Sequence, residues 1–208
     1  KRNEPKFKKA IAVRTILKTK SELNIDEHNI ALMMGKNCHL VIYPINKNKE
    51  LNLVCIIRSK KYNLDDIKSS INKVVSQNSN LKKILNEDLK SWPLYSTSQI
   101  LPSTNNKVFY IGDAFNGFLP TLAQGAGQSI ESAYELFNLL NEEKTDIQNI
   151  YFKERLKRAK IVRKRSNFNF FVFHFSSSIM QTIRNFFMKV LIKRKRFISS
   201  YLGKVYKN

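Results

Sequence analysis

The feature that most constrains this chain is a glycine-rich stretch at residues 108–140, VFYIGDAFNGFLPTLAQGAGQSIESAYELFNLL. It contains Gly112, Gly117, Gly125 and Gly127, which are four of the 6 glycines in the sequence. An apolar run of strand character precedes the first glycine, and a pattern of helical period follows the last. A strand that passes through glycines into the first turn of a helix can hold a polar, partly anionic ligand against backbone amides. The stretch therefore predicts a binding loop between a strand and a helix.

The loop is predicted to begin at the end of a buried strand. Residues 108–111 form this strand, and Gly112 ends it where a side chain would obstruct an approaching ligand. Asp113 follows directly, and its carboxylate can accept hydrogen bonds from sugar-type hydroxyl groups. The end of the strand thus presents an acceptor to a polar ligand.

The rest of the loop is predicted to lead into a helix. Pro120 fixes the direction of the backbone, and Gly125, Ala126 and Gly127 form the first helical turn. The free N–H groups and the positive end of the helix dipole would stabilise negative charge on a ligand. The buried face of this helix is predicted to consist of Ile130, Ala133, Tyr134, Phe137 and Leu140.

The loop resembles the GDAAHxxxPxxxQGxxxxxED motif of the FAD-dependent aromatic-ring hydroxylases, the group A flavoprotein monooxygenases that include salicylate and 4-hydroxybenzoate hydroxylases. The matching residues are Gly112, Asp113, Ala114, Pro120, Gln124, Gly125 and Glu131. Phe115 and Asn116 replace the usual Ala-His pair, and Ser132 replaces the usual Asp. The resemblance implies that FAD is bound by Gly112, Asp113, Pro120, Gly125, Ala126 and Gly127. It assigns Asp113 to the ribityl chain.

A second stretch resembles the same family. Residues 151–174, YFKERLKRAKIVRKRSNFNFFVFH, are similar to the family's terminal pattern YxxxRxxRaxxVxxxSxxxxxxfH. The matching residues are Tyr151, Arg155, Arg158, Ala159, Val162, Ser166, Phe173 and His174, and Arg184 with Asn185 extends the pattern. This match favours the salicylate-hydroxylase-like branch, in which the region braces the flavin domain and its residues are structural rather than catalytic.

The resemblance implies an α/β fold, with α+β character in the substrate part. Gly35 is the sole glycine in residues 1–107, so no GxGxxG turn occurs there, and the chain is interpreted as a C-terminal fragment that lacks this part and cannot retain FAD alone. We expect a partial substrate domain of mixed β-sheet over residues 1–100 and the return segment of a Rossmann-like FAD-binding domain over residues 101–145. A helical basic segment is expected over residues 146–208.

The substrate part is predicted to contain a strand at residues 10–17 and a hairpin of residues 39–45 and 51–57. The hairpin strand HLVIYPI resembles the HxVxYPx strand of the family, and Arg14 and Tyr43 are predicted to face an aromatic substrate. In the alternative reading, Arg14 is a solvated residue at a strand end and Tyr43 a core residue. Helices are predicted over residues 63–76 and 81–89, and Trp92 is predicted to be a core anchor.

The function implied by the resemblance is hydroxylation of an aromatic or related ring by FAD, NAD(P)H and O2 through a flavin hydroperoxide. FAD is the cofactor, NAD(P)H the co-substrate and a small aromatic molecule the substrate. No catalytic side chain is identified, because the cofactor carries the chemistry. One alternative is a quinone-biosynthesis type hydroxylase that acts on a lipid-tailed ring. A second, from a different class, is a non-catalytic basic module that binds membranes or nucleic acid.

The charge of the chain is strongly positive, with a formal net charge of +21. Glu154 is the last acid, and 15 Lys and Arg residues follow it. Residues 183–207 alternate aromatic or aliphatic residues with cations, as interfacial helices do, although a solvated basic helix has the same composition. We expect no nucleic-acid partner, a cytoplasmic location, and peripheral membrane contact through this basic segment as one outcome.

Metal and disulfide chemistry are not expected. His28, His39 and His174 lie far apart in the sequence, and no CxxC motif is present. Cys38 and Cys55 fall on the two strands of the predicted hairpin and are predicted to be free thiols.

Overall fold

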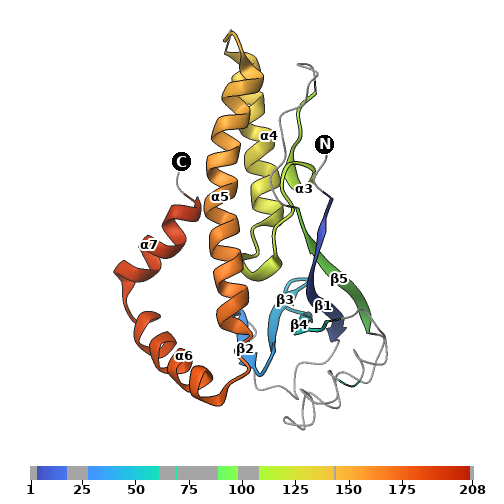
Figure 1. Ribbon diagram of the computed structural model, residues 1–208, viewed down its shortest axis with the longest axis vertical. Coiled ribbons are helices and arrows are strands. Elements are labelled where there is room, and N and C mark those ends of the chain that lie inside the picture. The colour runs from blue at the N-terminus through green and yellow to red at the C-terminus, as the bar shows by residue number, and fades with distance from the viewer. Residues whose placement is uncertain are drawn as a thin grey trace. The chain divides into compact units, whose positions relative to one another are not determined.

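The computed structural model describes residues 4–17, 28–60, 69, 89–97, 108–142 and 144–206. These residues form an α/β fold (Figure 1), as the sequence predicted. The strands are β1 (Lys6–Leu17), β2 (Ala31–Gly35), β3 (Cys38–Ile45), β4 (Glu50–Arg58) and β5 (Lys90–Ser96). The helical elements are α3 (Gly112–Phe115), the 3-10 turn η1 (Pro120–Leu122), α4 (Gly125–Asn141), α5 (Ile147–Phe173), α6 (Ser178–Leu191) and α7 (Lys195–Tyr206).

The chain divides into two compact units. The helical unit comprises Lys1–Phe7, Tyr95–Phe170 and Ile192–Asn208, and the sheet unit comprises Lys8–Leu94 and Phe171–Leu191. The motif loop and most of α5 are therefore in the helical unit, whereas α6 is in the sheet unit. The three domain ranges expected from the sequence remain predictions.

The five strands form one sheet with the order β2-β3-β4-β1-β5. The ladders between β2 and β3, β3 and β4, and β1 and β4 are antiparallel. The predicted hairpin is confirmed by β3 and β4, whose connection has left-handed backbone at Asn46, Lys47 and Asn48. Left-handed residues give a tight connection the twist that neighbouring strands need, and asparagine adopts this conformation more easily than most residues.

One face of the sheet carries the apolar core. Ile11 and Val13 of β1 and Leu53 and Cys55 of β4 are buried there, and β3 adds Leu40 and Ile42 in its centre. Successive residues of a strand point to opposite faces, so alternate positions of β1, β3 and β4 share this core. Cys38 and Cys55 are both buried free thiols on this face. Burial raises the pKa of the Cys38 thiol, which keeps it protonated.

The structure corrects two expectations about local structure. Residues 108–111 are not a buried strand: they form no ladder with any strand among the described residues, and both Val108 and Ile111 are exposed. A strand needs a second strand that pairs with its backbone, and no strand among the described residues pairs with this apolar run. Trp92 is 41% exposed on β5 rather than a core anchor. The helices predicted over 63–76 and 81–89 fall almost entirely outside the described residues.

Candidate functional site

The motif loop begins at a position that requires glycine. Gly112 has a φ of +56°, a left-handed conformation that L side chains rarely adopt. A Cβ atom on Gly112 would also lie 2.6 Å from Oγ of Ser129 on α4. The backbone of the loop can therefore approach α4 this closely only without a side chain. Sequence inspection identified the glycine, but Ser129 as the cause of the tight approach was not foreseen.

The other predicted ligand residues follow along this loop. Asp113 is exposed in the first turn of α3, and Pro120 begins η1. Ala123 then adopts a left-handed φ of 52° before α4 begins at Gly125, so the chain turns sharply into the helix. The structure thus brings the predicted residues into one continuous loop that ends at a helix N-terminus.

The N-terminus of α4 is open. Its N-cap residue, Gln124, makes no side-chain capping hydrogen bond, and a Cβ atom added to Gly125 would meet nothing within 4 Å. The first N–H groups of a helix have no partner within the helix, so those of Gly125, Ala126 and Gly127 are available to a ligand. The positive end of the dipole of this 17-residue helix favours an anionic or strongly polar group at the same place.

Helix α5 holds this loop from behind by hydrogen bonds to its backbone. Tyr151 Oη donates to the carbonyl of Tyr110 at 2.9 Å, just before the motif glycine. Ser166 Oγ donates to the carbonyl of Leu119 at 3.1 Å, and Thr121 Oγ1 donates to the carbonyl of Ser166 at 2.7 Å. Two stretches that resemble the same family therefore meet, and α5 braces the loop as the resemblance implied.

Asn116 stands where the family's motif has histidine, and α5 supplies its partner. Its side chain is buried, and its Oδ1 accepts a hydrogen bond from Nη2 of Arg163. Burial lowers the pKa of Arg163, although the guanidinium stays charged. The Nδ2 donor of Asn116 has no hydrogen-bond partner among the described residues. Sequence inspection did not predict this pair, because the two residues are 47 positions apart.

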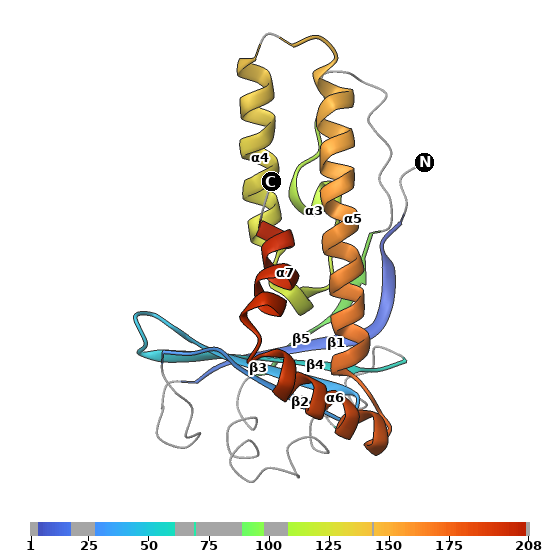
Figure 2. The same ribbon diagram turned by 90° about the vertical axis from the view of Figure 1, so that its left-hand side faces the viewer.

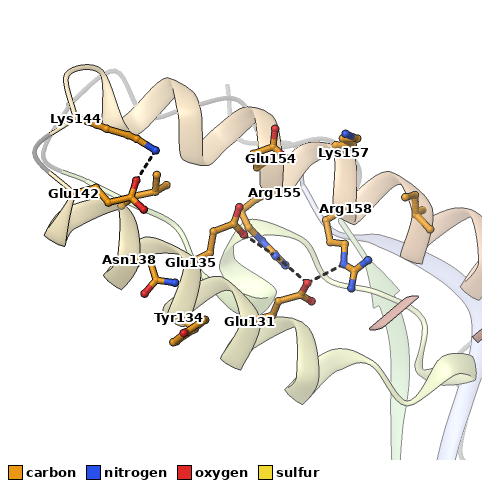
Figure 3. Close-up of a pocket in the computed structure, with 12 residues that line it drawn as sticks. Glu131, Tyr134, Glu135, Asn138, Glu142, Lys144, Glu154, Arg155, Lys157 and Arg158 are labelled. Atoms are coloured by element: carbon orange, nitrogen blue, oxygen red, sulfur yellow. Dashed lines mark hydrogen bonds and ion pairs between the residues drawn. The ribbon is translucent and has the colours of Figure 1, made fainter. Parts of the chain in front are cut away.

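A network of ion pairs joins α4 to α5, which lie side by side in Figures 1 and 2. Arg155 is buried and donates to Oε2 of Glu135 at 3.0 Å and to Oε1 of Gln128 at 2.9 Å. Glu131 Oε1 forms ion pairs with two arginines of α5, at 3.7 Å from Arg155 Nη1 and 2.9 Å from Arg158 Nε. Figure 3 shows Glu131 and Glu135 of α4 pointing toward Arg155 and Arg158 of α5. Arg155 and Arg158 of one motif stretch are thus paired with Glu131 and Glu135 of the other.

The same network lines an open groove of about 540 Å³ between the two helices (Figure 3). Its walls include Tyr134 and Leu139 of α4 and Ile161 of α5, together with the ion pairs. Neither Asp113 nor any motif glycine lines it. Because its acids and arginines neutralise one another, this groove is a helix–helix seam and not the predicted ligand site.

The buried face of α4 differs from the prediction. Ile130 is 71% exposed, and Tyr134, Phe137 and Leu140 are exposed as well. Gln128 and Ser132 are buried instead, on the side of the helix that meets α5. Helical spacing identified an apolar face correctly, but among the described residues nothing covers it. The side that packs on α5 is polar because it carries the network around Arg155.

The predicted substrate residues share one face of the sheet. Tyr43 lies opposite Asn52, and Arg14 lies opposite Val54, in the two ladders that flank β4. Opposed residues of an antiparallel pair share a face, as do residues two apart, so Arg14, Tyr43 and Asn52 are on the face opposite the apolar core. Arg14 is exposed and donates from Nε to Oδ1 of Asn52.

Asn52 adds an unpaired donor to this face. It is fully buried, and its Nδ2 has no hydrogen-bond partner among the described residues. An unpaired buried amide donor destabilises the protein by roughly 1–3 kcal/mol, so it marks a place where an acceptor from outside the described residues would be favourable. The structure therefore places the two predicted residues on one face, beside a third whose amide was not expected to be unsatisfied.

A buried histidine pair lies on this same face of the sheet. His39 Nδ1 is 3.1 Å from Nε2 of His174, which is also 3.3 Å from the carbonyl of Ile56. A carbonyl can only accept, so His174 Nε2 carries a proton and His39 Nδ1 accepts. Burial lowers the pKa of His39 to about 3, and the neighbouring His174 acts in the same direction. Among the described residues, no group of three or more His, Cys, Asp or Glu side chains could hold a metal ion.

Comparison with known proteins agrees with these features. No family model matches the chain. It is 33% identical to the FAD-dependent monooxygenase cfoG of Aspergillus candidus over 136 aligned residues. The aligned region covers 62% of this chain and 31% of cfoG. The chain is 27% identical to a salicylate hydroxylase of Pseudomonas putida over 169 residues, which covers 71% of this chain and 39% of that one.

Solved structures show the same fold. The chain superposes with a TM-score of 0.78 and 12% identity on Klebsiella pneumoniae HpxO complexed with FAD and uric acid. This superposition covers 98% of this chain and 54% of that one. A salicylate hydroxylase substrate complex gives a TM-score of 0.76 at 18% identity, with 98% and 55% covered. The chain spans 31% to 42% of the length of the curated relatives. In sequence the chain is thus similar to part of proteins named FAD-dependent monooxygenase and salicylate hydroxylase, and in fold it matches part of HpxO and of a salicylate hydroxylase.

Proposed function

We propose that the protein carrying this chain is an FAD-dependent monooxygenase that hydroxylates an aromatic ring with NAD(P)H and O2. The observation that carries the proposal is the loop that runs from Gly112 to the open N-terminus of α4. The relatives in sequence bear names of this activity, and the superposed structures include two complexes with FAD. The chain matches a part of each, so the activity is proposed for the whole protein.

The residues of the loop fit a flavin dinucleotide. Gly112 lets the loop backbone pack closely against Ser129 of α4, and at Gly125 a Cβ atom would meet nothing within 4 Å, so the first turn of α4 is accessible. Asp113 offers an exposed carboxylate to ribityl hydroxyls, and the free N–H groups of Gly125, Ala126 and Gly127 suit an electron-rich carbonyl edge. When bound, FAD would accept a hydride from NAD(P)H and activate O2. The chain itself would bind and orient the cofactor and keep the loop rigid through α5.

For the substrate, we propose an aromatic ring with an anionic or carbonyl oxygen substituent. The sheet face of Arg14, Tyr43 and Asn52 supports this class, because Arg14 presents an exposed guanidinium there that is held by Oδ1 of the buried Asn52. An anionic oxygen substituent would pair with the charge of Arg14, while the partly exposed Tyr43 would contact the ring. Replacing Arg14 by alanine should raise the KM for an aromatic acid roughly tenfold or more while flavin is retained. Equal KM values for the unchanged protein and for Arg14→Ala would show that Arg14 does not contact the substrate.

The test of the cofactor assignment is Asp113→Ala in the full-length protein. Loss of charge-assisted hydrogen bonds of this kind weakens binding by roughly 1.5–3 kcal/mol, which is about one to two decades in the Kd of FAD. Glu142→Ala is the matched control, because it removes an exposed carboxylate that is paired with Lys144 and lies outside the loop. Flavin fluorescence during titration measures both. The assignment is wrong if Asp113→Ala and Glu142→Ala bind FAD equally well.

For location, we propose a cytoplasmic protein that makes peripheral contact with a membrane through its basic C-terminal segment, residues 146–208. Support comes from the exposed cations that follow Glu154 in residues 155–208, a stretch that contains no acid. These exposed cations are Lys157, Lys160, Lys164, Lys189, Lys193, Arg194, Lys195 and Arg196. No helix in the described part of the chain is long and apolar enough to cross a bilayer. Attraction to anionic lipid amounts to about 1 kcal/mol per cation close to the surface.

A further inference from the structure

Helix α6 is fixed to the sheet unit by a buried arginine. Arg184 is 4% exposed, and its guanidinium donates to the carbonyls of Val172 and Phe173 at 3.4 and 3.3 Å and to that of Met34 at 3.3 Å. The first two carbonyls belong to the last turn of α5, and the third belongs to β2. Charged hydrogen bonds to three carbonyls have a strict direction, so they define which side of α6 faces inward.

A side of α6 next to the one that carries Arg184 is apolar and exposed. Phe186 is 65% exposed, and the other large exposed side chains are Ile179, Met180, Ile183, Phe187 and Val190. Positions 179, 183, 186, 187 and 190 recur at intervals of three and four residues, which puts them on one face of a helix. We call these exposed apolar residues the outer face of α6. The helix differs from an ordinary surface helix, because its charged Arg184 is buried and these apolar residues are exposed. A contiguous apolar face of this kind indicates a binding surface.

The charges near α6 identify the kind of partner. Lys189 is exposed on α6 itself, and Lys193, Arg194, Lys195 and Arg196 follow the helix directly in the sequence. A chain extends by at most about 3.6 Å per residue, so Arg196 stays within roughly 18 Å of Leu191 in any arrangement of the two units. A dense cluster of cations therefore accompanies the apolar face, which is the combination that helices at an anionic bilayer surface use.

A nucleic acid fits these residues less well. Phosphates would attract the cations, but bases are held by stacking on aromatic rings or by hydrogen bonds at their edges. Ile179, Ile183 and Val190 provide neither. Lipid acyl chains, in contrast, accept aliphatic and aromatic side chains equally. A helix of 14 residues is about 21 Å long, shorter than the bilayer core of about 30 Å, so α6 would lie along the surface.

We propose that the outer face of α6 is an in-plane membrane anchor that inserts into the interface of an anionic lipid surface. Arg184 holds the helix so that Phe186 and Phe187 point away from the protein, and the following cations contact lipid headgroups. The inference rests on the proposed peripheral membrane contact and is independent of the proposed hydroxylase activity. It narrows that contact from the whole basic segment to one helix face.

The test is co-sedimentation of the full-length protein with phosphatidylcholine vesicles that contain or lack phosphatidylserine. The double variant Phe186→Gln/Phe187→Gln removes the centre of the apolar face without a change of charge. Thr182→Gln is the matched control, because Thr182 is an exposed residue of the same helix outside that face. Both phenylalanines are more than half exposed, so folding should persist, and circular dichroism checks this.

We expect the unchanged protein to bind the anionic vesicles and to release them at high salt. The double variant should bind roughly a hundredfold more weakly, counting about tenfold for each phenylalanine removed from lipid, and Thr182→Gln should change binding less than about twofold. If the unchanged protein does not bind anionic vesicles, or binds an oligonucleotide more tightly, both the proposed membrane contact and the proposed α6 anchor are wrong. If the unchanged protein and the double variant bind the vesicles equally well, only the α6 anchor is wrong, and the basic segment is still the proposed membrane contact.

Discussion

The sheet and the helix pair α4–α5 are held together in different ways. The sheet packs an apolar face in which Val13 and Leu53 are completely buried. The helix pair buries the polar side chains of Arg155, Gln128 and Ser132, while four apolar side chains of α4 are exposed: Ile130, Tyr134, Phe137 and Leu140. Apolar packing depends on volume and shape, whereas a buried ion-pair network depends on direction and on every partner being present. The region that carries the motif loop is therefore the more sensitive to single polar changes.

The largest effect is expected in the sheet core. Leu53→Ala removes a fully buried side chain, and such a cavity lowers the free energy of unfolding by about 4 kcal/mol. Leu53→Met preserves the volume and should lower it by less than about 1.5 kcal/mol. Urea unfolding followed by circular dichroism measures both. If the two variants were equally unstable, the stability of the sheet core would not depend on side-chain volume.

The stability of the helix pair α4–α5 should depend on the charge and hydrogen bonds of Arg155 rather than on its volume. Arg155→Ala leaves Glu135 and Oε1 of Gln128 without their donor, whereas Glu131 keeps Arg158. It should lower the free energy of unfolding by about 3 kcal/mol, the lower end for a broken buried pair because Glu135 is partly exposed. Arg155→Met, which restores the volume, should be nearly as unstable. Lys153→Ala, at an exposed position of the same helix, provides the reference. Recovery of stability in Arg155→Met would show that this seam also depends on packing.

A pH titration separates the two regions further. The pKa of His39 falls from 6.5 to about 3 on folding, so the native state excludes a proton that the unfolded chain binds below pH 6.5. The stability of the sheet unit is then complete above pH 6.5 and is lost progressively as the pH falls toward 3. Between about pH 7.5 and pH 5 the loss should be about 2 kcal/mol. His39→Gln should flatten this slope in urea unfolding across that range, and an unchanged slope would assign the pH dependence to other groups.

The sequence predicted the features that depend on neighbouring residues. The hairpin β3–β4 needs two apolar strands and a short polar connection, and all three are visible within 39–57. The motif loop is equally local, because Gly112, Asp113 and Gly125 occupy positions whose spacing can be compared with a known pattern. The faces of the strands follow from strict alternation. These predictions required no knowledge of distant contacts.

Predictions failed where the partner of a segment had to be known. Helical spacing shows that α4 has an apolar face, but Gln128 and Ser132 look like surface residues until Arg155 is known to lie against Gln128. Residues 108–111 have strand composition but no strand beside them among the described residues. The contact between Asn116 and Arg163 and the unpaired amide of Asn52 likewise depend on tertiary structure, to which no local pattern corresponds.

The smallest expected effect tests the brace between α5 and the motif loop. Ser166→Ala removes the hydrogen bond from Oγ to the buried carbonyl of Leu119 and should lower the free energy of unfolding by about 1 kcal/mol. Ser199→Ala, at an exposed position of α7, should change it by less than about 0.5 kcal/mol. Titration of the full-length variants with FAD adds a second measurement, the Kd of FAD. A general loss of stability would not change this Kd, because both variants remain folded under native conditions. A brace that positions the loop predicts a Kd several times higher for Ser166→Ala alone. Equal Kd values would mean that Ser166 stabilises the helical unit without positioning the loop. The dependence on directed polar interactions would then be limited to the ion pairs between α4 and α5.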